Sequence, residues 1–168
     1  MTAEENRALI RRWIESINQG NLAVTDEVFA ANCVRRIIYH ANVSKVGRGP
    51  EGIKRRVAEW RAAFPDWHFT VEEMLAEGDR VMTRCTVRGT HRGELFGLPP
   101  TGRQVAYTEM ILSRVAEGRI VENSVLIDRL GLLQELGLLP DTAELLQRAR
   151  EEMLRSGGAD EGHEPRRV

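Results

Sequence analysis

The sequence predicts an α+β fold in which a curved, mostly antiparallel sheet wraps around N-terminal helices. Apolar residues at helical spacing dominate the first third of the chain, strand-like segments follow from Trp67, and a long β-hairpin occupies residues 104–128. Because helices come first and a run of strands follows, the helices are expected to cover one face of the sheet. A cone of this shape has a hollow centre, and such hollows commonly hold small molecules.

The hairpin Gln104–Asp128 is the segment around which the other elements are organised. β-Branched and apolar residues fill 105–112 and 120–127, as strands prefer. A three-residue loop, Ala116–Gly118, is predicted to join them, with Gly118 in the left-handed conformation. The resulting register predicts one shared inner face. That face would carry Tyr107, Glu109, Ile111, Ser113, Val121, Asn123, Val125 and Ile127.

Caps and apolar spacing predict the helices. Residues 2–5 form a capping box for a first helix that ends near Gly20, and Thr25 caps a short helix over 26–31. A third helix starts at Pro50 and stops at Phe64–Asp66. Helical spacing resumes over 129–139.

Three further strands are expected, over residues 34–41, 67–75 and 81–90, with a long loop over 91–102. His40 would end the first of these strands, and Lys45 would lie in a polar loop. Residues 1–139 are predicted to form one domain, 140–155 a C-terminal helix with its own capping box, and 156–168 a disordered tail without core residues.

Composition excludes several classes of protein. A net charge of −1 and a pI near 6.4 provide no basic field for nucleic acid or an anionic membrane. No apolar run approaches the ~20 residues of a membrane span. The first residues are acidic and polar, unlike a secretory signal, so we expect a cytoplasmic protein. Cys33 and Cys85 form no CxxC pair and are expected to be reduced thiols.

The sequence also restricts the chemistry. Lys45 and Lys54 are the only lysines, and arginine cannot form a Schiff base, which disfavours a lysine-imine enzyme. No metal-ligand spacing and no Gly-x-Ser-x-Gly elbow occurs. We therefore expect neither a metal nor another cofactor.

Several motifs recur in the order typical of one family. They are Gly49-Pro50-Glu51-Gly52-Ile53, Ala63-Phe64-Pro65-Asp66, Arg88-Gly89-Thr90-His91, Gly97-Leu98-Pro99-Pro100-Thr101-Gly102 and Gly118-Arg119-Ile120-Val121-Glu122. From the first helix to Leu139, the chain resembles the SnoaL-like polyketide cyclase family of the NTF2-like superfamily. The resemblance implies an NTF2-like cone. Family members include cyclases of polyketide methyl esters, whereas the superfamily also holds isomerases, epoxide hydrolases, dehydratases and non-catalytic domains.

The resemblance also implies a proton-transfer pair on the inner face of the hairpin. Counted from the Gly118 turn, the family histidine falls on Ile111 and the family aspartate on Val125. Neither residue can move a proton. The family tryptophan of the last strand is replaced by Ser124.

Glu109 is the inner-face residue best suited to acid/base chemistry, because apolar neighbours raise the pKa of a carboxyl group toward that of a useful general base. Glu109 could instead form an ion pair with an arginine, or lie at the solvent-exposed opening of the cone. Tyr107 and Asn123 could donate hydrogen bonds to a substrate oxygen, or serve only the structure. His40 could shuttle protons at neutral pH, or act as a cap or surface residue.

Aromatic and apolar side chains could line a pocket for a flat ligand or simply form the core. These predicted pocket-lining residues are Trp13, Trp60, Phe64, Trp67, Cys85, Val87, Phe96, Ile111 and Val125. His91 is expected to anchor the long loop, and His68 to be exposed.

Two functions remain open from the sequence. The first is a cofactor-free acid/base enzyme that performs aldol-type cyclisation, isomerisation or dehydration on a small hydrophobic carbonyl compound. The second is a non-catalytic ligand-binding or dimerisation domain. Met110, Leu112 and Leu126 would form an exposed apolar patch on the outer sheet face, so we expect a homodimer through that face.

Overall fold

The structure is a computed structural model that describes residues 1–39 and 42–156. The helices are α1 (Ala3–Asn18), α2 (Val24–Val28), α3 (Gly49–Ala63), α4 (Arg129–Glu135) and α5 (Thr142–Ser156). The strands are β1 (Phe29–Tyr39), β2 (Asn42–Arg48), β3 (His68–Glu77), β4 (Arg80–Thr90), β5 (Gln104–Ala116) and β6 (Arg119–Ile127).

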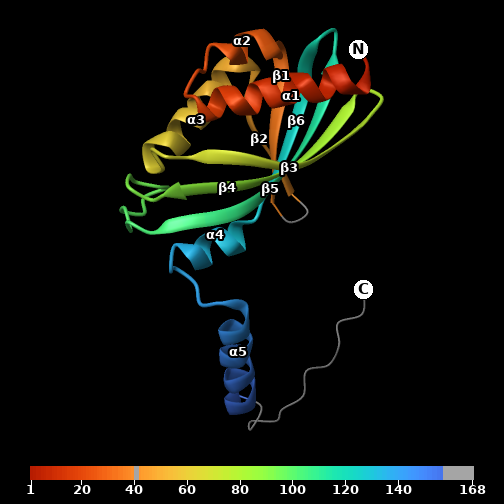
Figure 1. The fold of residues 1–168 in the computed structure, drawn as a ribbon. Coiled ribbons are helices and arrows are strands. Elements are labelled where there is room, and N and C mark those ends of the chain that lie inside the picture. Colours follow the sequence, from red (N-terminus) through yellow and green to blue (C-terminus); the bar gives the residue numbers. More distant parts are fainter. Residues whose placement is uncertain (40–41, 157–168) are drawn as a thin grey trace.

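The strands form one curved sheet in the order β2-β1-β6-β5-β4-β3. Neighbouring strands are antiparallel except β1 and β6, which are parallel. Helix α1 packs on β3 and β4, α3 packs on β1 and β2, and α4 lies against β5 (Figure 1). The predicted α+β cone, with helices covering the concave face, is confirmed.

The core lies between α1, α3 and the concave face of the sheet. The predicted capping box starts α1, with the Thr2 hydroxyl and the Glu5 carboxylate each bonded to the other's backbone N–H. Trp13 of α1 meets Phe29 of β1 edge to face, with ring centres 5.0 Å apart. Each fully buried side chain of this size contributes roughly 1.5–3 kcal/mol, so these contacts hold the helix on the sheet.

The hairpin differs from its prediction at the turn. Ala116 pairs with Arg119, so the loop has two residues, Glu117 and Gly118, both with positive φ. Twin positive φ angles mark a turn whose twist matches that of the flanking strands. A bulge at Val121 then restores the register. As a result Ile120 takes the buried position predicted for Val121, while Asn123, Val125 and Ile127 face inward as expected.

The second helix and first strand also differ from prediction. Helix α2 ends at Val28 and has no side-chain cap, since Thr25 is inside the helix and buried. β1 begins at Phe29, because Phe29 and Cys33 both contribute to the core. Lys45 belongs to β2 rather than to a loop. His40 and residues 157–168 of the predicted tail lie outside the described residues, and Ser156, expected to begin that tail, is the last residue of α5.

His91 anchors the long loop after β4, as predicted. Its ring is fully buried, and Nδ1 accepts a hydrogen bond of 3.2 Å from the Thr101 backbone N–H. The backbone N–H groups of Arg92 and Gly93 both donate to the carbonyl oxygen of Ala63 in α3. These bonds fix the loop against the end of α3. His68 is exposed, also as predicted.

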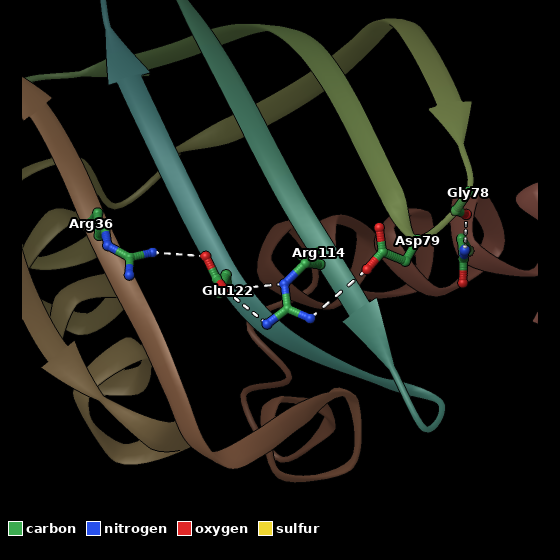
Figure 2. A network of polar contacts seen from close by, with 6 residues as sticks. Arg36, Gly78, Asp79, Arg114 and Glu122 are labelled. Atoms are coloured by element: carbon green, nitrogen blue, oxygen red, sulfur yellow. Dashed lines mark hydrogen bonds and ion pairs between the residues drawn. The ribbon is translucent and has the colours of Figure 1, made fainter.

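The outer face of the sheet carries ion pairs instead of covering helices. Glu122 lies between Arg36 and Arg114, with N–O distances of 3.0 and 2.8 Å, and Arg114 also approaches Asp79 at 3.8 Å (Figure 2). Such part-exposed pairs contribute little to stability, because water and salt screen their charges. Arg36 and Arg114 on this face are therefore paired with carboxylates.

Helix α5 projects away from the body (Figure 1), and none of its residues is buried. The structure places it at Thr142–Ser156, close to the predicted 140–155. Asp141 accepts a hydrogen bond from the Glu144 N–H, one half of the predicted capping box. Over the described part of the chain, every helix is too short or too polar to cross a bilayer.

Candidate functional site

Glu109 lies on the inner face of β5, directly opposite Cys85 of β4 and Ile127 of β6. The residue is only 3% exposed, and among the described residues its carboxyl group has no hydrogen bond or ion pair. Burial raises the pKa of Glu109 to about 7, and the charges of Arg35 and Arg56 oppose that rise. A carboxyl group with this pKa can gain or lose a proton near neutral pH.

Arg35 reaches the same interior from β1. Its Nη1 donates a hydrogen bond of 2.8 Å to Oδ1 of Asn123, the residue beside it in β6. Asn123 in turn donates from Nδ2 to the Ser113 hydroxyl at 3.0 Å. Because arginine only donates, the amide oxygen must face it. Sequence analysis missed Arg35, although strand alternation with the buried Cys33 and Ile37 would have placed it inward.

Tyr107 lies two positions before Glu109 and therefore on the same face. Its hydroxyl accepts a hydrogen bond of 3.1 Å from Nε1 of Trp67. Burial raises the pKa of Tyr107 well above its ordinary value, so the hydroxyl keeps its proton and can donate it. The Tyr107 ring lies 6.2 Å from that of Trp60, which stacks on Trp67 at 5.6 Å. These rings form one aromatic wall beside Glu109.

Ile111 and Val125 are direct cross-strand partners on the inner face. Both are buried, with exposures of 1% and 0%. Their hydrocarbon side chains transfer no proton. The correspondence of these two positions to the family histidine and aspartate remains a prediction from the sequence.

An apolar groove of about 250 Å³ lies between α4 and the loop that follows β4. Arg56 of α3 places its guanidinium carbon 5.7 Å from the Trp60 ring centre and 5.1 Å from that of Phe96. Trp60 thus connects the groove to the aromatic wall. The lining residues are Trp60, Leu95, Phe96, Leu98, Arg129, Leu132, Leu133, Leu136 and Leu138.

The other predicted pocket-lining residues, Trp13, Phe64, Trp67, Cys85 and Val87, lie in the buried core. The Arg35 guanidinium carbon lies 5.6 Å from the centre of the Trp13 ring. Burial raises the pKa of the Cys85 thiol to about 12, so the thiol stays protonated. His40 lies outside the described residues. Among the residues described, no three His, Cys, Asp or Glu side chains gather as a metal site would require.

The arrangement is suited to proton transfer in a buried, largely apolar interior. The Glu109 carboxyl group titrates near neutral pH, and the charges of Arg35 and Arg56 act on it. The Tyr107 phenol lies on the same face of β5. Charges act over longer range where water is excluded. Tyr107 lies on the same face beside Glu109 as expected, whereas Asn123 pairs with Ser113, four residues along β5 from Glu109. Asn123 is linked to the site through Arg35, and the structure adds Arg35 and Arg56, whose charges act on Glu109.

The model of one family, the SnoaL-like polyketide cyclases, matches residues 7–136. The chain belongs to this family. A relative, the aklanonic acid methyl ester cyclase DauD of Streptomyces sp. (strain C5), is 30% identical over 138 residues, which span 77% of this chain and 80% of that protein.

Solved structures of similar proteins share the fold. IdmH, a putative polyketide cyclase from Streptomyces antibioticus, is 35% identical, with a TM-score of 0.69 over 79% of this chain and 98% of that one. AclR, a putative hydroxylase from Streptomyces galilaeus, is 27% identical, with a TM-score of 0.75 over 92% of this chain and 95% of that one. The NTF2-like architecture implied by the sequence motifs is therefore confirmed.

Proposed function

We propose that this protein is a cofactor-independent cyclase that closes a ring in a hydrophobic polyketide ester by an intramolecular aldol reaction. The curated relatives act on methyl esters of this class, such as aklanonic acid methyl ester. Isomerisation or dehydration of a similar carbonyl compound would need the same acid/base group. The apolar groove beside Trp60 supports a small hydrophobic carbonyl compound as the substrate.

The buried Glu109 carboxyl group is the observation that carries the proposal. It lies among apolar side chains, and its pKa of about 7 leaves much of it ionised at neutral pH. General bases work best when their pKa is near the operating pH. Buried glutamates without a bonded partner are costly to folding, which favours a functional reason for this one.

In the proposed reaction, Glu109 removes a proton from the carbon between two carbonyl groups and leaves an enolate. The Tyr107 hydroxyl donates a hydrogen bond to the enolate oxygen. The enolate carbon then attacks a second carbonyl carbon of the same molecule, and the resulting alkoxide takes the proton back from Glu109. No oxidant or reductant is consumed. Asn123 has its amide oxygen and one N–H engaged, so we assign it to positioning Arg35.

The test compares the wild-type protein with Glu109→Gln on polyketide methyl esters, with ring closure followed by chromatography and mass spectrometry. Loss of a general base typically costs about 10²–10⁴ in rate, and we expect a loss in this range. Glu122→Gln on the outer face is the matched control and should retain activity. Equal rates for wild type and Glu109→Gln would overturn the proposed role.

A second candidate function, ligand binding without catalysis, is favoured by the Ile111–Val125 pair. If the family proton-transfer residues occupied these positions, their replacement by hydrocarbon would remove the usual chemistry and keep the chamber. Under this alternative the wild-type protein would bind the methyl ester with measurable heat and return it unchanged. Catalytic turnover of the bound ester would exclude it.

We also propose that a second copy of the chain covers the outer sheet face. An apolar groove of about 450 Å³ there includes Met110, Leu126 and Leu130, and Leu126 and Leu130 are each 46% exposed. The same face presents charges of both signs, Arg36 and Glu122 among them. A face with both signs can complement itself about a two-fold axis, so we assign it to a homodimer.

A further inference from the structure

Arg35 is a buried cation without a carboxylate partner. It is 8% exposed, and no acidic side chain among the described residues lies within ion-pair distance of it. Its neighbour Arg36 points to the opposite face of β1 and pairs with Glu122 at 3.0 Å (Figure 2). Of these two adjacent arginines, only the outer one forms an ion pair, whereas the charge of Glu109 acts on Arg35 from beyond ion-pair distance.

The contacts of Arg35 orient its guanidinium group but leave donors unused. Nη1 binds the neutral amide oxygen of Asn123, and Nε is buried without a hydrogen-bond partner. The group also lies over the ring of Trp13. Guanidinium presents five N–H donors in a planar fork that matches the oxygens of an anion. The Asn123–Ser113 hydrogen bond holds the amide that fixes this fork.

The charges inside the cone favour a ligand anion. Arg35 and Arg56 both act on Glu109, while Arg56 has a carboxylate of its own, Glu59, at 3.0 Å. Removing a charge from water without pairing it costs several kcal/mol, so Arg35 is a destabilising group that folding alone does not explain. An anionic oxygen placed against it would supply the missing partner in a low-dielectric setting.

We propose that Arg35 binds an anionic oxygen of the ligand, so that the protein selects flat hydrophobic molecules carrying a carboxylate or an enolised 1,3-dicarbonyl group. The Trp13 ring and the aromatic wall of Trp60 and Tyr107 would contact the hydrophobic part. This inference depends on the ligand-binding part of the proposed function and deepens it, because an enolate held at Arg35 would be the intermediate that Glu109 creates. Carboxylate and enolate share the chemistry that Arg35 recognises, and the probes below separate them.

Binding of three probes to the full-length protein tests the proposal, with titration calorimetry as the readout. The probes are 2-naphthoate, its neutral isostere 2-naphthamide, and 2-phenylindane-1,3-dione, which is an enolate at neutral pH. We expect at least one anion to bind the wild type tenfold or more tightly than the amide. A preference for the dione alone would identify enolates as the ligand class, and a preference for naphthoate would identify carboxylates.

Arg35→Met keeps the length and apolar stem of the side chain and removes the charge. It should abolish the anion preference while leaving the affinity for 2-naphthamide within about twofold. Arg36→Met, one residue away on the outer face, is the matched control and should keep the preference. If Arg35→Met does not fold, the proposal is tested by the wild-type protein alone: a tenfold or greater preference for an anion over 2-naphthamide supports it, and equal affinities overturn it.

Equal affinities of the wild type for anions and amide, or an anion preference that survives Arg35→Met, would overturn the proposal. Neither result bears on Glu109, whose role is judged by turnover of the Glu109→Gln variant. Conversely, a protein that binds anions through Arg35 but shows no Glu109-dependent turnover would retain this inference and lose the cyclase assignment.

Discussion

Ile111 of β5 and Val125 of β6 face each other directly across the hairpin, both fully inside the cone. Side chains at such positions have Cβ atoms about 4.5–5.5 Å apart, close enough for a histidine and an aspartate to bond. Hydrocarbon at both positions leaves Glu109, two residues from Ile111, as the carboxyl group of the inner hairpin face. In the function we propose, Glu109 is therefore the acid/base group of this strand.

A double-mutant cycle measures this relationship. Ile111→His and Val125→Asp should each destabilise the fold by about 1–3 kcal/mol, because each buries a polar group without a partner. The double variant should lose about 1 kcal/mol less unfolding free energy than the two single variants lose together, because the two new side chains can form a hydrogen bond with each other. Urea unfolding of the four proteins supplies the values. Simple additivity would show that the pair does not meet in the folded protein.

The pH dependence of stability reports on Glu109. Its pKa rises from 4.5 to about 7 on folding, so the folded state binds the proton more tightly. The stability this provides is complete below pH 4.5 and is lost as the pH rises through about 7. The full difference is about 3 kcal/mol.

Glu109→Gln should remove this pH dependence and exceed the wild type in stability above pH 7. Denaturant unfolding between pH 4.5 and 8.5 is the measurement. Glu122→Gln is an informative control, because hydrogen bonds from Arg114 and Arg36 lower the pKa of Glu122. Ionised Glu122 therefore stabilises the folded state at neutral pH, and this contribution to the free energy of unfolding is lost as the pH falls. Parallel profiles for wild type and Glu109→Gln would rule out a raised pKa at Glu109.

Local signals in the sequence were sufficient for much of the fold. The capping box at Thr2, the proline at the start of α3 and the alternating residues of the hairpin each determine structure through contacts nearby in the chain. The turn at Glu117 was predicted one residue too long, because the compensating bulge at Val121 depends on the partner strand. Bulges leave little trace in a single sequence.

The candidate site was predictable only in part, because it is assembled from distant segments. Glu109 and Tyr107 follow from the register of one hairpin. Arg35 meets Asn123 only through the parallel pairing of β1 with β6, which joins residues 88 positions apart. Arg56 approaches from a helix. Alternation in β1 does indicate that Arg35 points inward, yet nothing local says which groups it meets there.

The loop that borders the groove depends on Gly93. Its N–H donates to the Ala63 carbonyl oxygen, and an added Cβ would overlap the carbonyl oxygen of Ala62. Gly93→Ala should therefore push the loop off α3 at a cost of about 1–3 kcal/mol. Binding of 2-naphthamide should weaken as well, since Leu95 and Phe96 would shift. Glu94→Ala, an exposed change in the same loop, should affect neither measurement.

The outer-face dimer makes Leu126 a sensitive position. Leu126→Arg would bring two like charges together across a two-fold axis and bury them without partners. We expect light scattering after size exclusion to show a dimer for the wild type and a monomer for the variant. Leu146→Arg, at a more exposed site on α5, should remain dimeric. Dissociation by the α5 variant instead would locate the interface on that helix.

The domain boundary proposed at residue 139 can be tested by ending the chain there. Removal of α5 takes away no buried residue, and near the cut it breaks the hydrogen bond from the Gln134 side chain to the Pro140 carbonyl oxygen. A part-buried bond of this kind contributes about 0.5–1.5 kcal/mol. Chains ending at Leu139 and at Ser156 should therefore melt within a few degrees of each other. A chain ending at Leu139 that aggregates or unfolds at room temperature would mean that α5 covers apolar surface in the assembled protein, and the domain would then have to include it.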